Sequence, residues 1–487
     1  MTRLRWTSVA AIAASGLILG PLAFACGTDD GVGPPACSGV DCDGGSVDAT
    51  LADGGADANV TDAGSDGEPV DASDASAACP GPAGTLDPTF GDGGIVWLKY
   101  PGSGASSVVV QTDGKIVVGG AVSSRTFALV RLLEDGSPDL TFGTGGLVET
   151  KVAPTFNSSL TGLALQTDGK ILATGKADQE VGQRSYDFAV VRYLPNGELD
   201  QTFGSGGAVT TDFGAADFTS DSPESLILQP DGRILVGGRS GSPSDFAVAR
   251  YLADGAPDPT FGVAGKTLID VQGTADTPGV LVRLSTGKIV VAGSSLRTSP
   301  PLRTDIAAVQ LNADGTVNPS FANGGRLVAD LGGASSVSAG ADVGGKAVLA
   351  GQVAPGDFAV LRVTGAGTLD PGFGVGGVVV TDFGGRGDDA HAVLVQSDGK
   401  LIVAGQSLGA RVNDPDMGIA IARYLPGGGL DTLFGASGRA LIVPPVDTTY
   451  GVSAAAISGC SIIVVGGWQY DNSTLGKSAM GLARFRR

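Results

Sequence analysis

The chain has 487 residues, of which 80 are glycine, and a formal net charge of −19 at pH 7. A net acidic chain without a basic stripe is unsuited to binding nucleic acid. Its single histidine, His391, excludes zinc sites built from several histidines. Any Ser-His-Asp triad would likewise depend on that one residue.

Residues 1–25 have the pattern of a secretory signal peptide. A basic head with Arg3 and Arg5 precedes an apolar run that is too short to span a membrane. The residues before Cys26 resemble a bacterial lipobox, although Phe24 is larger than the residue usual at its position. We predict that Cys26 is lipidated and anchors the protein to the cell envelope. The A-x-A sequence ending at Ala25 permits the alternative, ordinary cleavage and release to the extracellular space.

Residues 26–85 have the composition of a tether. From Gly27 to Thr85 there are eleven aspartates and one glutamate but no lysine or arginine. Such a segment cannot bury a core and its like charges repel one another, which predicts an extended, disordered linker. Its acids lack the ligand spacing of an EF-hand loop.

The rest of the chain, residues 86–487, repeats one aromatic motif. The motif is LDPTFGDGGIV at Leu86–Val96 and returns in forms such as LDQTFGSGGAV from Leu199. A repeat period of 52 to 61 residues indicates a repeat architecture. The shared aromatic residue falls at Phe90, Phe142, Phe203, Phe261, Phe321, Phe373 and Phe434.

Three more apolar runs accompany each copy of the motif. Two of them flank a glycine-containing turn, as in SVVVQTDGKIVVGG at 107–120, and predict a β-hairpin. FALVRL at 127–132 and the residues after each motif predict two further strands. Four strands in each of seven units predict an all-β fold, a seven-bladed β-propeller of four-stranded blades forming one domain over 86–487.

A glycine recurs near the end of the second hairpin strand in every unit. Glycine inside a strand pattern indicates that another segment of backbone approaches closely. The positions are Gly119, Gly175, Gly237, Gly293, Gly351, Gly405 and Gly466.

Together, LDPTFGxGG, VQxDGKIxVxG and FAVxRYLxxG resemble the delta-60 repeat, which occurs in tandem in secreted and surface proteins of bacteria. The resemblance covers residues 86–487 and implies a β-propeller. It implies no particular activity.

An arginine precedes the acidic residue of the next motif by eight residues in five units. One unit replaces both partners, with Gln310 and Asn318, and this joint change indicates contact. Arg484 lacks a downstream partner and Asp87 an upstream one, so we predict that these two residues meet and close the ring. The other expected pairs are Arg131–Asp139, Arg192–Asp200, Arg250–Asp258, Arg362–Asp370 and Arg423–Asp431.

If Cys26 is lipidated, Cys37, Cys42, Cys79 and Cys460 remain. An exported protein with four cysteines is expected to form two disulfides, for which three pairings exist. Cys37 and Cys42 are close enough in sequence to pair within the tether. If Asp87 docks on the last unit, Cys79 becomes a neighbour of Cys460, and a bond between them would fix the tether to the closing blade.

No residue stands out as catalytic. His391 occupies a position at which other units have Ser106, Thr161 or Glu224, and we interpret this position as a solvated strand end. Asp388 and Asp389 could bind a cation or act as an acid–base pair. The DGxxD pattern of Asp135 with Asp139, and of Asp254 with Asp258, could bind calcium, although turn formation and pairing with arginine explain that pattern more simply. We therefore expect no cofactor.

Two classes of function remain. The first is an exported, surface-tethered propeller that acts as a monomeric binding or scaffold module for a protein or glycan, held at the membrane by its lipid. The second is an extracellular hydrolase or lyase with an acidic site in the axial channel. Fold alone does not decide between them. We favour binding, because the departures between units are mostly Gly, Ala and Ser.

Overall fold

The computed structural model describes residues 79–100, 103–122, 126–152, 158–178, 186–214, 220–241, 243–384, 387–409, 417–443, 449–469 and 478–487. The predicted signal peptide, Cys26, Cys37, Cys42 and the tether up to residue 78 lie outside the described residues. Within them, no helix is long and apolar enough to cross a membrane.

The described strands form seven antiparallel sheets, which we number as blades in chain order. Blade 1 is β2 (Gly104–Val110), β3 (Ile116–Ala121), β4 (Phe127–Leu132) and β5 (Leu147–Thr150), and blade 2 is β6 (Ser158–Leu165), β7 (Ile171–Asp178), β8 (Tyr186–Tyr193) and β9 (Ala208–Thr211). Blade 3 is β10 (Ser222–Leu228), β11 (Ile234–Ser240), β12 (Asp245–Tyr251) and β13 (Lys266–Ile269), and blade 4 is β14 (Asp276–Arg283), β15 (Ile289–Arg297), β16 (Arg303–Leu311) and β17 (Arg326–Ala329). Blade 5 is β18 (Ser335–Val343), β19 (Lys346–Val353), β20 (Asp357–Val363) and β21 (Val378–Thr381), and blade 6 is β22 (Gly387–Val395), β23 (Leu401–Leu408), β24 (Met417–Tyr424) and β25 (Arg439–Ile442). Blade 7 contains β26 (Thr449–Tyr450), β27 (Ala454–Ser458), β28 (Ser461–Gln469), β29 (Ser478–Arg486) and β1 (Ile95–Leu98).

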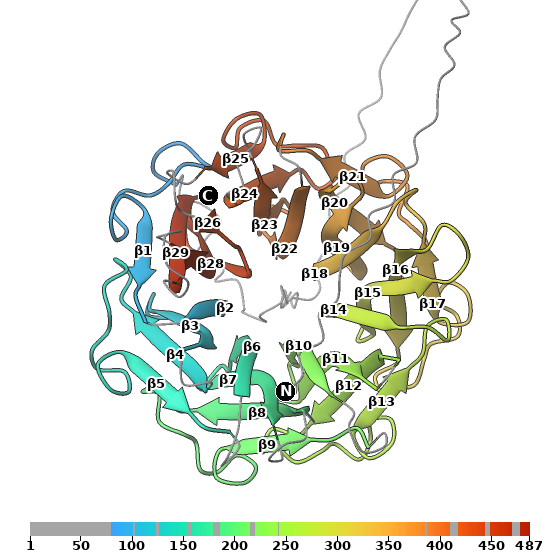
Figure 1. The fold of residues 1–487 in the computed structure, drawn as a ribbon, viewed down its shortest axis with the longest axis horizontal. Coiled ribbons are helices and arrows are strands. Elements are labelled where there is room, and N and C mark those ends of the chain that lie inside the picture. Colours follow the sequence, from blue (N-terminus) through green and yellow to red (C-terminus); the bar gives the residue numbers. More distant parts are fainter. Residues whose placement is uncertain are drawn as a thin grey trace, which may run out of the picture. The chain divides into compact units, whose positions relative to one another are not determined.

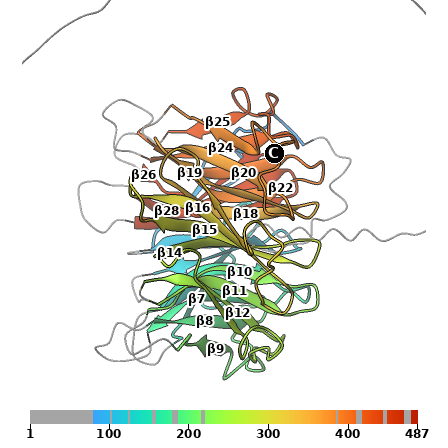
Figure 2. The ribbon, with the colours of Figure 1, turned by 90° about the vertical axis from the view of Figure 1, so that its right-hand side faces the viewer.

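The blades surround a common axis, with the first strand of each innermost (Figure 1). This arrangement confirms the predicted all-β, seven-bladed propeller of four-stranded blades. The connections lie along two opposite faces (Figure 2). Because the strands are antiparallel, every aromatic motif lies on one face, called here the motif face, and the first strand of each blade begins at the other, called the opposite face.

Blade 7 is closed by the N-terminal end of the folded part. Its outermost strand is β1, which pairs with β29 in the register Ile95↔Ala483 to Leu98↔Met480. The place of the innermost strand is shared by β26 and β27, which both pair with β28. The ring is thus closed by hydrogen bonds between the two ends of a chain segment of about 400 residues.

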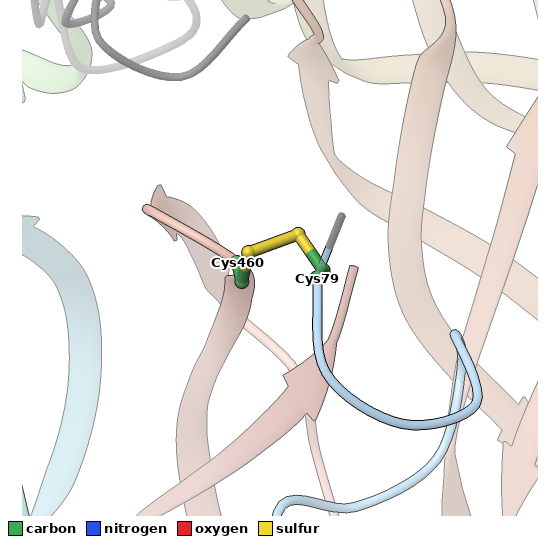
Figure 3. The surroundings of a disulfide bond; sticks show 2 residues. All are labelled: Cys79 and Cys460. Carbon is green, nitrogen blue, oxygen red and sulfur yellow. A yellow bond between two sulfur atoms is a disulfide. The ribbon is translucent and has the colours of Figure 1, made fainter. Parts of the chain in front are cut away.

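The segment just before β1 also belongs to blade 7. The amide of Gly84 donates to the carbonyl of Arg486 at 2.8 Å, and the amide of Gly435 in blade 6 donates to the carbonyl of Ala83 at 2.9 Å. A disulfide joins Cys79 to Cys460 in the turn between β27 and β28, as expected (Figure 3). Residues 79–85, predicted to belong to the tether, instead pack against the last two blades.

The core lies between neighbouring blades. Phe142 is fully buried with Val109, Val117 and Leu129 of blade 1 and with Ile171 and Tyr193 of blade 2. The equivalent aromatic residue of every motif is likewise 0% exposed. Burying a phenylalanine or leucine contributes about 1.5–3 kcal/mol, so each interface adds many such contributions and each blade depends on its neighbours.

In six of the seven blades, a largely buried arginine near the end of the third strand reinforces this interface on the motif face. In blade 1, Arg131 Nε donates to Asp139 Oδ2 at 2.9 Å, and Arg131 Nη1 donates to the carbonyl of Pro195 in blade 2 at 2.5 Å. The guanidinium also stacks on the Phe142 ring, 4.5 Å from its centroid. One side chain therefore joins its own motif to the next blade. We call this arrangement the clasp.

The other expected pairs are in contact as well. Arg192–Asp200 and Arg250–Asp258 are 2.8 Å apart, Arg362–Asp370 is 2.7 Å and Arg423–Asp431 is 2.9 Å. In the variant unit, Asn318 Nδ2 donates to Gln310 Oε1 at 2.6 Å. Arg484 donates to Asp87 at 2.9 Å and also to the carbonyl of Glu134 in blade 1, so the clasp closes the ring as well.

The clasp predicts how stability depends on acid. Burial raises the pKa of the Asp139 carboxyl, but hydrogen bonds from the Thr141 hydroxyl and amide and the charge of Arg131 outweigh burial and hold that pKa at about 2. The unfolded value is about 3.9. The charge of Asp139 therefore contributes stability that is complete above about pH 4 and is lost as the pH falls towards 2.

We expect Asp139→Asn to lower the free energy of unfolding by roughly 1–3 kcal/mol near neutral pH. The difference from the wild-type protein should shrink towards zero between about pH 4 and pH 2, as measured by urea unfolding at each pH. Asp92→Asn, at an exposed position on the same motif face, serves as the control. A difference that stays constant with pH would mean that the charge of Asp139 is not what matters.

Candidate functional site: the axial cavity

A cavity of about 500 Å³ lies where the innermost strands meet. Six of these strands carry a β-bulge near the opposite face, and in blade 7 the break between β26 and β27 takes its place. The bulge leaves one residue per blade out of the ladder, and that residue lines the cavity. These residues, called here the axial ring, are Ser106, Thr161, Glu224, Gly279, Ser338, His391 and Ser453.

The position of His391 corrects one expectation. We interpreted the variable position as a solvated strand end because it accepts such different residues. The structure places His391 at the bulge of β22, inside the cavity, with its side chain 24% exposed. The bulge takes His391 out of the pairing between β22 and β23, so the alternation of the strand does not fix the direction of its side chain.

A glycine opposite each bulge makes the axial ring possible. At Gly238, which pairs with Pro223, a Cβ would lie far inside van der Waals distance of the Ser222 carbonyl oxygen, so any side chain there would overlap the backbone. The same carbonyl approach occurs in all seven blades, at Gly120, Gly175, Gly238, Gly293, Gly351, Gly405 and Gly466. The expected close approach is thus present, but in blades 1 and 3 it occurs at Gly120 and Gly238, one residue after the predicted Gly119 and Gly237.

Glu224 is the one carboxylate of the axial ring. Glu224 is exposed and lines the cavity. Its carboxylate accepts a hydrogen bond from the Ser222 hydroxyl at 3.0 Å. Desolvation by the surrounding protein raises the pKa of Glu224, against the opposing effects of Ser222, Arg239 and Lys176. From the sequence, Glu224 is only one of the residues that replace His391 in other units, so its place in the cavity was not predicted.

His391 is accompanied by Asp389. His391 Nε2 lies 3.4 Å from Asp389 Oδ2, without the geometry of a hydrogen bond. Burial raises the pKa of Asp389 and the nearby imidazole opposes that shift. The cavity therefore has a carboxylate from blade 3, an imidazole with a neighbouring carboxylate from blade 6 and hydroxyl groups from the five other blades.

Asp135 and Asp139 of the DGxxD pattern have the roles in a turn and in an arginine pair that we expected. Asp135 Oδ1 accepts a hydrogen bond from the amide of Ser137, whereas Asp139 belongs to a clasp. Asp388, by contrast, belongs to a group of three aspartates, together with Asp357 and Asp382.

Three such groups, called here the acidic triads, lie on the opposite face, each at the junction of two blades. In each triad, the three aspartates each contribute one carboxylate oxygen, and these three oxygens lie within 4.8 Å of one another. Desolvation, followed by repulsion from Asp212 and Asp221, raises the pKa of Asp187 to about 6. The triads are Asp187–Asp212–Asp221, Asp245–Asp270–Asp276 and Asp357–Asp382–Asp388.

Five segments of the chain match a family described as "Domain of unknown function (DUF5122) beta-propeller": residues 111–142, 166–203, 229–261, 284–321 and 396–434. Each segment runs from a hairpin turn to the following aromatic motif. The match and the seven sheets together define the chain as a β-propeller repeat protein.

Solved structures with a similar fold include virginiamycin B lyase from Staphylococcus aureus, at 11% identity and a TM-score of 0.44, covering 80% of this chain and 98% of that one. An α-L-arabinanase from Penicillium chrysogenum, complexed with arabinobiose, is 11% identical with a TM-score of 0.40, covering 79% and 92%. A family PL25 ulvan lyase is 10% identical with a TM-score of 0.43, covering 82% and 94%. No curated protein sequence matches the chain.

The glycines opposite the bulges provide a structural test. We expect Gly238→Ala to lower the free energy of unfolding by roughly 1–3 kcal/mol, because the added methyl group meets backbone atoms that cannot move independently. Gly429→Ala, where a Cβ has open space, should leave stability nearly unchanged. Urea unfolding of both variants checks this, and equal effects of the two substitutions would contradict the role given to Gly238.

Proposed function

We propose that the protein is an exported binding module that takes a polar group of an extracellular glycan or protein into its axial cavity. The hydroxyl groups of the axial ring both donate and accept hydrogen bonds, as a hydroxylated ligand requires. Glu224 and His391, from different blades, would fix the orientation of such a ligand.

The observation that carries this proposal is the contrast between the axial ring and its surroundings. The seven units keep the clasp, the motif phenylalanine and the glycine opposite the bulge nearly unchanged, because these residues hold the blades together. At the axial ring the same units carry five residue types: serine, threonine, glutamate, glycine and histidine. Residue diversity at a position that lines a cavity, within an otherwise repetitive frame, favours recognition of an asymmetric ligand.

One observation favours the alternative, a hydrolase or lyase. Glu224 has a raised pKa and could donate a proton, and His391 with Asp389 could accept one, all at the same cavity. Turnover of a bound polysaccharide would decide between this alternative and simple binding.

The test begins with a glycan array and is followed by calorimetric titration of the ligands found. We expect Glu224→Gln and His391→Gln each to weaken binding about tenfold or more, since each removes a charged or hydrogen-bonding partner. Asp92→Asn, on the motif face, should bind like the wild-type protein. A ligand that binds both cavity variants with unchanged affinity would overturn the axial site.

The same samples answer the catalytic question. Release of reducing ends or of unsaturated sugars, abolished in Glu224→Gln while binding persists, would establish the hydrolase or lyase. A ligand recovered intact from the wild-type protein would support the binding module.

We further propose that Cys26 carries a lipid that anchors the protein, as a monomer, to the bacterial cell envelope. The lipobox-like residues before Cys26 and the acidic segment after it support this proposal, as does the resemblance of the repeats to the delta-60 repeat of secreted and surface proteins.

Intact mass and non-reducing peptide mapping of the mature protein from a bacterial host provide the check. We expect a diacyl modification on Cys26, absent from Cys26→Ser, and a peptide linking Cys79 to Cys460. An unmodified chain released into the medium would contradict the lipid anchor. Linkage of Cys79 to Cys37 or Cys42 would contradict the bond that fixes blade 7.

A further inference from the structure

The acidic triads follow a rule that extends over all seven blade junctions. Every complete triad is accompanied by a serine at the end of the second strand of the later blade: Ser240, Ser295 or Ser407. Asp276 is directly paired with Ser295, and Asp388 with Ser407. Where the triad is missing, the serine is missing too. The equivalent residues are Val353, Ala177, Val122 and Trp468.

The four positions therefore change together. At three junctions none of the three acidic positions holds an aspartate. The first two aspartates of each complete triad are always 25 residues apart, as Asp245 and Asp270 are. Because the four side chains come from four different strand ends, only a shared partner gives them a reason to change as a set.

The buried acid of each triad has an oxygen without a partner. Asp276 is 0% exposed, and its Oδ2 accepts a hydrogen bond from the amide of Val271 at 2.8 Å. Its Oδ1 is also buried and receives no hydrogen bond. The same holds for Asp221 and Asp388, each 1% exposed, with the amides of Phe213 and Phe383 on Oδ2.

Unsatisfied buried carboxylate oxygens are costly, since each has lost its water without gaining a donor. The hydroxyl groups of Ser240 and Ser407 are likewise buried and without a hydrogen bond of normal geometry. Ser407 lies opposite Asp388 in the strand pairing, and Ser240 follows Arg239, which lies opposite the residue after Asp221, so both hydroxyl groups are at the triads. An oxygen-binding cation would satisfy both groups at once.

The spacing of the carboxylates suits calcium. Calcium binds oxygen atoms at about 2.3–2.6 Å, so two ligands on opposite sides of one ion are about 5 Å apart. The carboxylate oxygens of each triad lie within 4.8 Å of one another. Among the described residues, none of these nine carboxylates forms an ion pair with lysine or arginine. The middle aspartates Asp212, Asp270 and Asp382 accept hydrogen bonds at their backbone carbonyls from Lys266, Arg326 and Arg439, respectively.

The junction of blades 4 and 5 shows what replaces the ion. It keeps two of the acids, Asp305 and Asp330, but has Ser335 in place of the third. Here Arg297 Nε lies 2.7 Å from Asp305 and its Nη2 lies 2.9 Å from Asp330, and Arg303 contacts the same two carboxylates. At the one junction that keeps two of the three acids, guanidinium groups therefore neutralise both carboxylates.

From these observations we propose that the three acidic triads are calcium sites that bind one ion each between neighbouring blades. Three carboxylates and the serine hydroxyl supply the protein oxygens, and water completes the coordination. The ions neutralise the charge of the triads and join blades 2 and 3, 3 and 4, and 5 and 6 on the opposite face. This role is independent of any ligand in the axial cavity.

Calcium bound per chain, measured by equilibrium dialysis at about 1 mM calcium, provides the first test. The acidic tether can add weakly bound ions, so the informative quantity is the difference between variants. Asp276→Asn preserves shape and the hydrogen bond from Val271, and it should bind one ion fewer than the wild-type protein. Asp92→Asn should bind the same number. Equal binding by Asp276→Asn and wild type would overturn the proposal.

Thermal unfolding with and without calcium provides the second test. In EDTA, Asp276→Asn should be at least as stable as the wild-type protein, because it relieves repulsion among three carboxylates. In calcium the order should reverse, since the wild type alone gains from the third ion. Destabilisation of the same size in both conditions would show that Asp276 is only structural, and a wild-type Tm unaffected by calcium would also overturn the proposal.

Discussion

A buried guanidinium is stable only if its charge is balanced and its N–H groups are bonded, and the whole ring depends on meeting that requirement. Arg131 does so with the carboxylate of its own motif, the ring of Phe142 and a carbonyl group of the next blade. Since the third partner belongs to a different blade, no unit can satisfy its arginine alone. Each buried arginine therefore holds two neighbouring blades together. The same interaction between Arg484 and Asp87 joins the two ends of the ring.

The two faces of the propeller meet different constraints. On the motif face, nearly every junction is held by the clasp, whereas the opposite face varies from junction to junction. The junction of blades 4 and 5 is exceptional on both. It has the amide pair Gln310–Asn318 in place of a clasp, and it has two arginines in place of a complete acidic triad. The axial ring, near the opposite face, varies from blade to blade and lines the axial cavity.

The sequence contained most of the fold but little of the site. The aromatic motif at Phe90 and its equivalents, with the apolar runs that accompany it, predicted the blades. The joint change to Gln310 and Asn318 predicted the arginine–aspartate pairs and the closure at Asp87, but not the hydrogen bond from each arginine to the next blade. The place of His391 could not be predicted, because a bulge shifts the alternation of inward and outward side chains by one residue. The acidic triads were missed although the recurring interval of 25 residues between acids was visible, because the third acid follows connections of different length, nine residues from Asp212 to Asp221 and six from Asp270 to Asp276.

The disulfide between Cys79 and Cys460 also determines how the propeller bears mechanical load. A force that pulls on the chain before Cys79 enters blade 7 through the sulfur atoms and passes directly into the hairpin of β27 and β28. The residues from Pro80 to Leu98, including all of β1, then carry none of that force. Without the bond, the same pull would act first on the hydrogen bonds of Ala83 and Gly84, then on the Asp87–Arg484 pair, and after these on the pairing of β1 with β29. The covalent link therefore protects the pairing of β1 with β29 from opening stepwise under a force applied before Cys79.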